Sequence, residues 1–412
     1  MPRSPFYDQA ETRGRDEREA ALFAALPAQI ARAQSTRAFA ETLRGVAPAD
    51  IADRAALARL PVLRKSDLMV RQRADPPFAG ANAVAMAELA RVFHSPGPMY
   101  VPQPARVDFA RMARALFAAG LRAGDLVHVS FAFHFTPGGW MMDGGARALG
   151  CPVFPASTGN TELQAQTIAE LRPRGYAGTP SFLKIVLEKG KEMKFDHSSL
   201  ACALVSGEAF APSLQQAIKE LGVDAYQCYA TADAGLIAYE SPAREGMVLD
   251  EELIVEIVRP GTGDSVPEGE VGEVVITSLA PEYPLIRLGT GDLSAILSGP
   301  SPCGRTNARI KGWMGRADQT TKVKGMFVHP HQVAEVLRRH DGIVRGRLVV
   351  GQVDGADVMT LRCETFGAGA ALADALRASI QAVCKLKGEV ELVAPGTLPN
   401  DGKVIDDLRT YR

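Results

Sequence analysis

Apolar side chains recur every three or four residues in the first part of the chain and gather into short runs further on. Residues 1–75 are rich in Ala, Arg, Glu and Leu, and EREAALFAALPAQIARAQS within them has its apolar positions at helical spacing. We therefore predict a helical N-terminal region. From residue 107, amphipathic helical segments (107–121, 139–150, 161–173, 213–222) alternate with short apolar strands (125–133, 151–157, 175–180, 224–230). This alternation predicts a mostly parallel sheet with crossover helices.

The pattern changes after residue 237. Apolar strands broken by Gly, Pro and Asp, at 253–258, 272–279 and 293–297, predict a smaller β-rich subdomain. The segment GWMGRADQTTKVKG ends it, and about ninety residues with their own helix and strand alternation follow. That length can bury a small core, so we place a domain boundary near Asp318.

Composition excludes several classes of protein. The chain has 412 residues, 46% of them hydrophobic, which indicates a folded protein of two to three domains. A net charge of −1 provides no overall field for nucleic acid or an anionic membrane. No stretch approaches the roughly 18 apolar residues of a spanning helix and the start lacks a signal-peptide pattern, so we expect a cytoplasmic protein. The six scattered cysteines, with no C-x-x-C pair, are expected to be reduced.

A series of short motifs runs through nearly the whole chain. In order, they are YDQAETRGRDE, RLPVLRKSDL, GNTELQAQ, GTPSFL, VSGEAF, GEVVITSL, PLIRLGTGDL, PSPCGRTNARI, GRADQTTKVKG, VHPHQVAEVL and PGTLPNDGKVIDDLR. In content, order and spacing this series resembles the adenylate-forming superfamily and, within it, the phenylacetate-CoA ligase family. The resemblance implies an α/β fold. A large N-terminal AMP-binding and acid-binding domain (1–317), with parallel sheets, crossover helices and a β-rich subdomain, would precede a small mobile α+β C-terminal lid domain (318–412).

Two motifs carry predicted nucleotide contacts. Asp292 in PLIRLGTGDL stands at a strand edge, where a carboxylate can accept hydrogen bonds from two adjacent ribose hydroxyls; in isolation, such a residue is more often a turn Asp. The resemblance implies that Asp292 and Arg316 bind the ribose of ATP. It also implies that Asp318 is the hinge of a large C-terminal domain rotation. Arg287 either neutralises phosphate charge or forms a structural ion pair.

The loop VSGEAF places Ser206, Gly207 and Glu208 at a predicted strand end, where ligands gather in open α/β sheets. The resemblance implies that this loop lies against the adenine, whereas a tight turn would use Gly207 with no ligand present. Lys403, in LPNDGKVIDDLR, is implied to be the principal catalytic side chain. A Lys on a mobile domain can stabilise the negative charge that grows on the α-phosphate as pyrophosphate leaves. A lone C-terminal Lys would otherwise be a surface residue.

The segment FHSPGPMYVPQ departs from the family's phosphate loop, which is approximately S-S-G-T-T-G-K-P. Ser95 and Gly97 remain, but the threonines and the lysine are gone. Pro96 and Pro98 also lack backbone N–H donors. Because such donors and hydroxyls normally cradle the β- and γ-phosphates, we expect a weaker hold on them here.

A second departure lies in YATADA. Tyr229 of the family motif is kept, and Thr231 stands one position early for the hydroxyl that contacts the α-phosphate. Asp233 replaces the Glu that helps to hold magnesium. An Asp also binds Mg²⁺ through oxygen but reaches one methylene less far, so Asp233 is the candidate magnesium ligand.

The third departure concerns zinc. The positions that match the structural zinc ligands of many relatives are Ser241, Met247, Ser301 and Cys303. One soft ligand cannot complete a tetrahedral site, so we expect no zinc.

The segment SFAFHFTPGGW supplies the candidates for an acid pocket: Phe133, His134, Phe135 and Trp140. The resemblance implies that they line a pocket for an aromatic carboxylic acid, although aromatic rings at strand ends are more often part of the core. His134 either contacts the carboxylate or is a satisfied buried histidine.

These residues predict an AMP-forming acyl- or aryl-CoA ligase that uses ATP, Mg²⁺ and coenzyme A to activate a small carboxylic acid. The alternative is a non-ligase paralogue that binds AMP or an acyl-adenylate and has a degraded ATP-phosphate site. A third hypothesis stops at the adenylate and passes it to another nucleophile. We expect neither nucleic acid nor a membrane as partner. The acid, the acceptor and the oligomeric state, a homodimer included, stay open.

Overall fold

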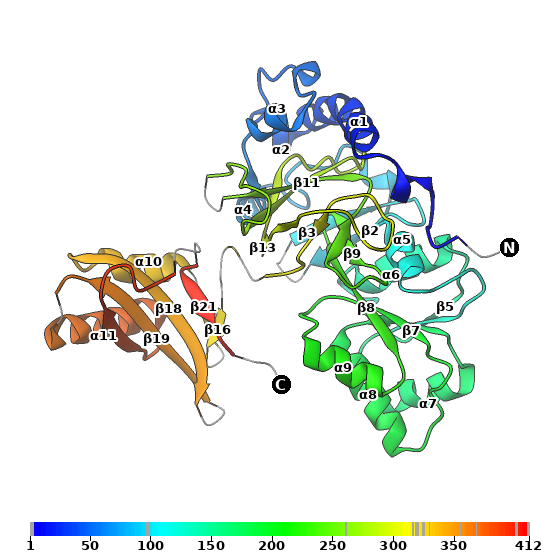
Figure 1. Ribbon diagram of the computed structural model, residues 1–412. Helices are drawn as coiled ribbons and strands as arrows, with labels where there is room; N and C mark the ends of the chain where they lie inside the picture. The colour runs from blue at the N-terminus through cyan, green and yellow to red at the C-terminus, as the bar shows by residue number, and fades with distance from the viewer. Residues whose placement is uncertain are drawn as a thin grey trace. The chain divides into compact units, whose positions relative to one another are not determined.

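The computed structural model describes residues 4–95, 99–259, 262–314, 317, 321–323, 326–328, 330–353, 356–367, 369–399 and 403–409. The chain divides into two compact units (Figure 1). The large unit comprises Met1–Thr290 and Ser294–Trp313, and the small unit comprises Gly291–Leu293 and Met314–Arg412. Asp318, the expected boundary residue, lies outside the described residues.

The large unit is built on a nine-stranded sheet. Its strands are β4 (Val127–Val129), β5 (Val153–Pro155), β6 (Gly175–Gly178), β7 (Cys202–Val205), β8 (Asp224–Thr231), β9 (Gly235–Glu240), β10 (Met247–Leu249), β14 (Ile296–Leu297) and β15 (Arg309–Ile310). In space the order is β14-β15-β10-β9-β8-β7-β6-β4-β5. The run from β8 to β5 is parallel, which confirms the predicted parallel sheet, and the other strands extend it antiparallel.

Helices cover both faces of this sheet. They are α5 (Met112–Ala118), α6 (Gly138–Ala148), α7 (Thr161–Leu171), α8 (Pro180–Glu192) and α9 (Pro212–Glu220). Leu204 of β7 belongs to the core that α5 and α6 complete, whereas its neighbours Ala203 and Val205 belong to the core that α7, α8 and α9 complete. This is the two-residue alternation of a strand buried on both faces. The hydrophobic pattern predicts every one of these helices except α8.

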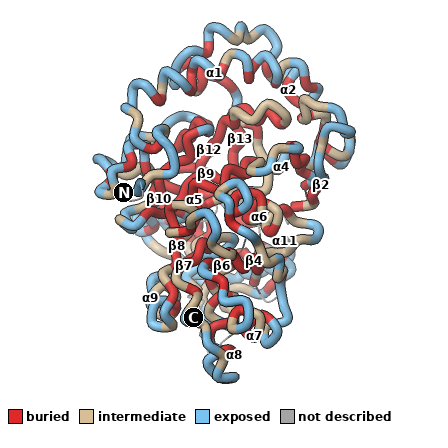
Figure 2. The backbone as a smooth tube through the Cα atoms, turned by 90° about the vertical axis from the view of Figure 1, so that its right-hand side faces the viewer, coloured by how far each residue is buried: buried red, intermediate tan, exposed pale blue. Residues whose placement is uncertain are grey.

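A second sheet of order β1-β13-β12-β11 packs with the N-terminal helices. It consists of β1 (Leu63–Arg64), β11 (Leu253–Val258), β12 (Gly272–Ser278) and β13 (Leu288–Ser294), and the helices are α1 (Arg15–Ser35), α2 (Arg37–Ala40), α3 (Arg54–Ala58) and α4 (Lys65–Ala74). Short 3₁₀ helices cover Gln9–Thr12, Pro48–Asp50 and Met86–Glu88. The predicted helical N-terminal region is therefore confirmed. The β-rich region is divided, because β9, β10, β14 and β15 join the nine-stranded sheet. Figure 2 shows the strands of the large unit as mostly buried stretches of the chain.

A hairpin of β2 (Leu89–Ser95) and β3 (Met99–Pro104) carries the phosphate-loop segment between its strands.

The small unit has a sheet of order β20-β19-β18-β21, made of β18 (Ile343–Val353), β19 (Ala356–Thr365), β20 (Glu389–Val393) and β21 (Ile405–Asp407). It also holds the pair β16 (Thr321–Val323) and β17 (Met326–Val328), and the helices α10 (Pro330–Arg338) and α11 (Ala370–Cys384). Helices and strands alternate in this unit, as the sequence predicts, around a core of its own.

The N-terminal segment is tied to the large unit by a buried carboxylate. Glu11 is fully buried, and its Oε1 accepts hydrogen bonds from Tyr239 Oη at 2.6 Å and Arg305 Nε at 2.9 Å. Its Oε2 accepts the backbone N–H of Tyr7 at 2.7 Å. We call these four residues, Tyr7, Glu11, Tyr239 and Arg305, the N-terminal clasp.

Candidate active site

Polar residues follow the carboxyl ends of β7 and β8, the edge at which ligands bind in open parallel sheets. Ser206, Gly207 and Glu208 come directly after β7, Thr231 ends β8, and Asp233 comes two residues later. The structure therefore places two of the predicted motifs, VSGEAF and YATADA, on neighbouring strands of one sheet edge. This edge is the candidate active site.

The loop after β7 is held by its neighbours. Ser206 Oγ donates to the carbonyl of Cys228 at 2.8 Å, so the fold uses this hydroxyl. Gly207 has a φ of +87°, a backbone conformation that favours glycine, and it is exposed. Glu208 accepts the backbone N–H of Ser181 at 2.6 Å, in the first turn of α8, where a carboxylate is favoured by the helix dipole. The exposed backbone at Gly207 remains available to a ligand.

The end of β8 is buried more deeply. Tyr229 is buried, and Thr231 Oγ1 accepts the backbone N–H of Ala234 at 3.2 Å, which closes the turn that presents Asp233. Only 1% of the Asp233 side chain is exposed. Its Oδ2 lies 2.6 Å from Lys65 Nζ, and its buried Oδ1 has no hydrogen-bond partner among the described residues. A buried carboxylate oxygen without a hydrogen-bond partner is costly. Glu251 and Glu256, which pair with buried arginines, each have such an oxygen too, so it is the position of Asp233 just beyond the end of β8 that makes it a candidate ligand.

Tyr283 adds a second unpaired group near this carboxylate. Its hydroxyl is buried and makes no hydrogen bond within the described part of the chain. Burial, and to a smaller extent the charge of Asp233, raises the pKa of Tyr283, so the phenol stays protonated and can donate. Asp233 and Tyr283 thus offer one free acceptor and one free donor.

Lys65 reaches this edge from the N-terminal region. It is the first residue of α4 and follows β1, which pairs in parallel with β13 so that Leu63 faces Leu288 and Arg64 faces Gly289. Arg64 also forms an ion pair with Glu273 of β12. Strand pairing therefore fixes the backbone that carries Lys65.

Arg287 stabilises the chain just before β1. It is buried, with Nε 3.0 Å from Glu256 Oε2, and its Nη1 donates to the carbonyls of Ala58, at 2.7 Å, and Leu60. Its Nη2 donates to the carbonyl of Gly263 at 2.8 Å. Of the two interpretations from sequence, the phosphate role is wrong and the structural ion pair is correct, because protein acceptors surround the guanidinium in a buried position.

Asp292 lies on β13 and is buried, with 8% of the residue exposed. Two residues earlier, Thr290 Oγ1 donates to the carbonyl of Val274 at 2.9 Å, so this part of the strand is fixed. The ribose role of Asp292 stays a prediction.

Ser95 ends β2 and is buried, and its Oγ accepts the backbone N–H of Met99 at 3.4 Å across the phosphate-loop segment. Gly97 lies outside the described residues. The backbone N–H of His94 donates to the carbonyl of Phe135 at 2.8 Å. This bond joins the hairpin to the predicted acid-pocket segment.

The acid-pocket candidates divide into a packed pair and an exposed pair. Trp140 Nε1 donates to the carbonyl of Phe133 at 2.9 Å, their rings meet edge-on at 5.3 Å, and the Arg91 guanidinium stacks 3.7 Å from the centre of the Trp140 ring. Phe135 is 78% exposed with a φ of +59°, and His134 is exposed beside it. The interpretation of His134 as a satisfied buried histidine is therefore wrong.

The remaining site residues belong to the C-terminal part. Lys403 lies in the small unit, with Nζ 3.2 Å from Asp406 Oδ1. Arg316 and Asp318 lie outside the described residues. The roles of all three stay predictions.

Two of the four positions that match zinc ligands in many relatives lie close together. Ser301 Oγ lies 3.1 Å from Cys303 Sγ. Burial alone would raise the pKa of the Cys303 thiol, but hydrogen bonds from Ser241, Ser301 and Arg305 outweigh burial and hold the pKa below its ordinary value. Within the described ranges, no three His, Cys, Asp or Glu side chains gather in a way that could hold a metal. The absence of zinc stays a prediction.

Magnesium makes different demands from zinc. Mg²⁺ is usually bound by one or two carboxylates together with substrate phosphates, and it keeps several waters. Asp233 fits this role through its unpaired Oδ1, although its Oδ2 is held by Lys65.

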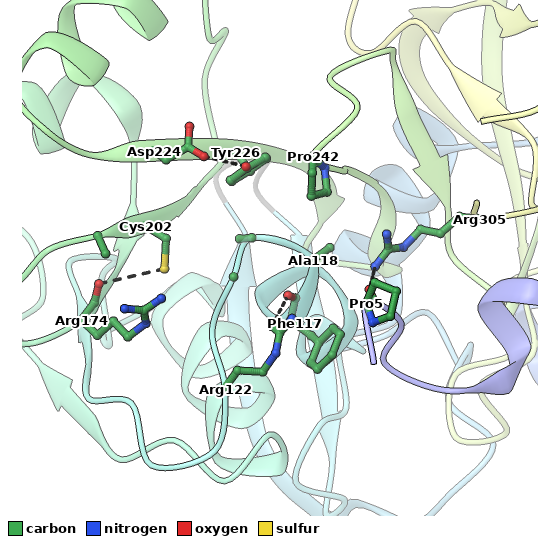
Figure 3. Close-up of a pocket in the computed structure, with 13 residues that line it drawn as sticks. Pro5, Phe117, Ala118, Arg122, Arg174, Cys202, Asp224, Tyr226, Pro242 and Arg305 are labelled. Carbon is green, nitrogen blue, oxygen red and sulfur yellow. Dashed lines mark hydrogen bonds between the residues drawn. The ribbon is translucent and has the colours of Figure 1, made fainter. Parts of the chain in front are cut away.

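The opposite ends of the same strands border a separate pocket of about 280 Å³ (Figure 3). It includes Cys202 and Asp224, the first residues of β7 and β8, together with Arg122, Arg174 and Arg305. It contains none of the residues predicted to bind nucleotide or acid. We therefore do not assign the reaction to this pocket.

Sequence reasoning missed Lys65 and Tyr283. Lys65 stands in RLPVLRKSDL, one of the family motifs, but is separated from Asp233 by 168 positions, so their pairing is visible only in the fold. Tyr283 stands four residues before Arg287 in an apolar segment, which is typical of a core tyrosine.

Comparisons with known proteins show the family of the chain. Residues 108–280 match the family model described as AMP-binding enzyme. A phenylacetate-coenzyme A ligase of Thermus thermophilus is 32% identical over 329 residues, which cover 75% of this chain and 73% of that protein. One of Aromatoleum evansii is 32% identical over 339 residues, covering 78% of this chain and 75% of that protein.

A solved structure, 2-hydroxyisobutyryl-CoA ligase with 2-HIB-AMP and CoA in the thioesterification state, covers 99% of this chain and 94% of its own. Its TM-score is 0.75 and its identity is 27%. The predicted fold class is thereby confirmed. In the described segments, no helix is both long and apolar enough to cross a membrane. With a third of its positions shared over three quarters of its length, the chain belongs to the phenylacetate-coenzyme A ligase family of adenylate-forming enzymes.

Proposed function

We propose that the protein is an AMP-forming acid–thiol ligase that activates a small carboxylic acid, with coenzyme A as the acceptor. The observation that carries this proposal is the 32% identity to phenylacetate-coenzyme A ligases over most of the chain. The paired strand ends that bring VSGEAF and YATADA to one sheet edge support it. An aromatic acid is favoured by Phe133, Phe135 and Trp140 beside the hairpin.

The reaction has two steps. A carboxylate oxygen attacks the α-phosphorus of ATP, the bond to the β-phosphate oxygen breaks, and pyrophosphate leaves. The sulfur of coenzyme A then attacks the acyl carbon, the bond to the phosphate oxygen breaks, AMP leaves, and the thiol proton passes to water. Lys403 stabilises the charge that develops in the first step.

The chain's own residues position the nucleotide. Asp292 and Arg316 hold the ribose, the backbone of Ser206–Glu208 borders the adenine, and Asp318 is the pivot between 1–317 and 318–412. When bound, Mg²⁺ neutralises phosphate charge, and Asp233 is the residue that holds it. The buried hydroxyl of Tyr283, which has no hydrogen-bond partner in the described structure, is a donor available to a ligand beside Asp233.

The alternative, a paralogue that only binds AMP or an acyl-adenylate, rests on the altered segment from Ser95 to Met99. It predicts nucleotide binding without turnover. The family membership and the coexistence of Asp233, Asp292 and Lys403 favour the ligase.

A pyrophosphate-release assay across a panel of aryl and short acyl acids separates the two. The ligase predicts release with at least one acid in the absence of coenzyme A, because adenylation precedes thiol attack. Thioester should form only when coenzyme A is added. Binding of AMP with no release for any acid would overturn the ligase in favour of the binding protein.

A further inference from the structure

Lys65 forms an ion pair with a carboxylate that is more deeply buried than Lys65 itself. Its ammonium lies 2.6 Å from Asp233 Oδ2, and 24% of its side chain is exposed, whereas its partner is almost fully buried. Lys65 is therefore the partner of this pair that solvent reaches. The other oxygen of Asp233 has no hydrogen-bond partner in the described structure, so the pair leaves the carboxylate half satisfied.

Strand pairing fixes the backbone of Lys65, and its side chain forms the ion pair with Asp233. The pairing of β1 with β13 and the Arg287 contacts to Ala58 and Leu60 hold the chain before it. The four-carbon stem of a lysine has three rotatable donors at its end and can turn to a second acceptor without backbone movement. A fixed backbone that carries a long, rotatable side chain suits an ammonium group that exchanges one acceptor for another.

The phosphate-loop segment has no cation of its own. The segment from Ser95 to Met99 contains no lysine or arginine, and two of its residues are prolines. The terminal phosphates of ATP nevertheless carry the largest charge of the substrate, and charge-assisted hydrogen bonds are their usual partners. Lys65 borders the carboxylate that we assign to Mg²⁺, and hence the place where those phosphates lie in the proposed function.

We propose that Lys65 is the phosphate-binding lysine of this site: it neutralises Asp233 in the nucleotide-free protein and turns to the terminal phosphates of ATP when Asp233 binds Mg²⁺. This inference rests on the proposed function. It adds a role for a residue outside the phosphate-loop segment, and it makes the Lys65–Asp233 pair a competitor of metal binding.

Calorimetric titration of the full-length protein with AMP and with Mg-ATP tests the proposal. Lys65→Met should weaken Mg-ATP about ten- to a hundredfold, the value of one charge-assisted hydrogen bond, and leave AMP within about twofold. Lys65→Arg should restore most of the loss. Arg73→Met is the matched control, because it removes a charge from an exposed position eight residues later in α4 and should change neither affinity.

A second measurement uses ATP without metal. Asp233→Asn releases Lys65 from its partner, so metal-free ATP should bind about tenfold more tightly than it binds the wild type. A lysine that only stabilises the fold would not produce this gain. The double variant Lys65→Met with Asp233→Asn leaves no buried unpaired charge, and it should lose that gain.

Three outcomes would overturn the proposal. Equal loss of AMP and Mg-ATP affinity in Lys65→Met and in the double variant would make Lys65 structural. Unchanged Mg-ATP affinity in Lys65→Met would place the phosphates elsewhere. Absence of AMP binding in the wild type would overturn the proposed function itself and the role of Lys65 with it.

Discussion

Two buried carboxylates of the large unit, Glu11 and Asp233, are surrounded in opposite ways. Both oxygens of Glu11 accept hydrogen bonds, from Tyr239, Arg305 and the backbone of Tyr7. Only one oxygen of Asp233 has a partner, Lys65, among the residues described. Burial is nearly the same, at 0% exposed for Glu11 and 1% for the Asp233 side chain. The difference therefore lies in hydrogen-bond satisfaction. The ion-paired Glu251 and Glu256 also have one unpaired oxygen, but Asp233 follows the end of β8 at the candidate site, where a ligand can satisfy it.

This comparison predicts that the largest loss of stability follows the removal of Glu11 from the N-terminal clasp. Glu11→Ala should lower the free energy of unfolding of the large unit by about 3–5 kcal/mol, because it leaves Arg305 buried without its anionic partner. Urea unfolding followed by tryptophan fluorescence measures this. Trp140 and Trp313, the two tryptophans of the chain, both belong to the large unit.

Glu19→Ala is the control for the clasp. Glu19 pairs with Arg54 at 2.7 Å, but 44% of the Arg54 side chain and 31% of the Glu19 side chain are exposed, so its removal should cost only about 0–1 kcal/mol. Equal losses of unfolding free energy in the two variants would show that the hydrogen bonds of buried Glu11 stabilise the fold no more than an ion pair with partly exposed side chains does.

The second prediction moves from stability to chemistry. Lys403→Ala should slow adenylation about a hundred- to a thousandfold, about 2.7–4 kcal/mol of transition-state stabilisation, and leave the unfolding of the large unit unchanged. Thioester formation from a supplied acyl-adenylate should remain. Single-turnover assays of each half-reaction check this, with Lys387→Ala, an exposed lysine of the same unit, as control. Equal loss of both half-reactions would contradict the assignment.

The third prediction concerns Asp233, the carboxylate of which only one oxygen has a hydrogen-bond partner among the described residues. Without Mg²⁺, AMP should bind on the order of a hundredfold more tightly than ATP. Asp233 retains Lys65, and the segment from Ser95 to Met99 has lost two donors worth roughly 1.5–3 kcal/mol each. Calorimetry with both nucleotides, with and without Mg²⁺, measures the gap, which should narrow when the metal is added. Equal affinities without metal would show that other residues already hold the terminal phosphates.

The fold could be predicted because its signals are local. Strand–helix alternation between residues 107 and 230 predicts the parallel sheet. Because β7 and β8 are neighbours in that sheet, Ser206 after β7 lies beside the last part of β8. Helix α8 was missed because its segment, SFLKIVLEKGKE, directly follows a short strand and has a polar second half.

The site could be predicted only where motif and backbone position coincide. Asp233 lies at a strand end, as its motif implies, whereas Lys65 is brought to it by a pairing of β1 with β13 across more than two hundred residues. Arg287 shows the converse, since its motif position suggests a phosphate ligand but the fold surrounds it with carbonyls. Pairings between distant segments depend on tertiary packing, which hydrophobic periodicity does not encode.

The smallest effect concerns a buried carboxylate of the small unit, Glu364, whose Oε1 accepts two hydrogen bonds. Hydrogen bonds from Arg345, at 2.9 Å, and from the backbone N–H of Leu398, at 2.6 Å, lower the pKa of Glu364 to about 2. A carboxylate with a lowered pKa stabilises the folded state above its unfolded pKa of about 4.3, and this contribution is lost as the pH falls through about 2. Glu364→Gln should therefore lower the thermal midpoint of the small unit near pH 7, and the gap from wild type should shrink near pH 3. Differential scanning calorimetry measures both, with Glu391→Gln in the exposed pair with Arg362 as control. A difference in thermal midpoint that is independent of pH would mean that Glu364 acts through packing alone. Its hydrogen bonds would then not distinguish it from any other buried side chain.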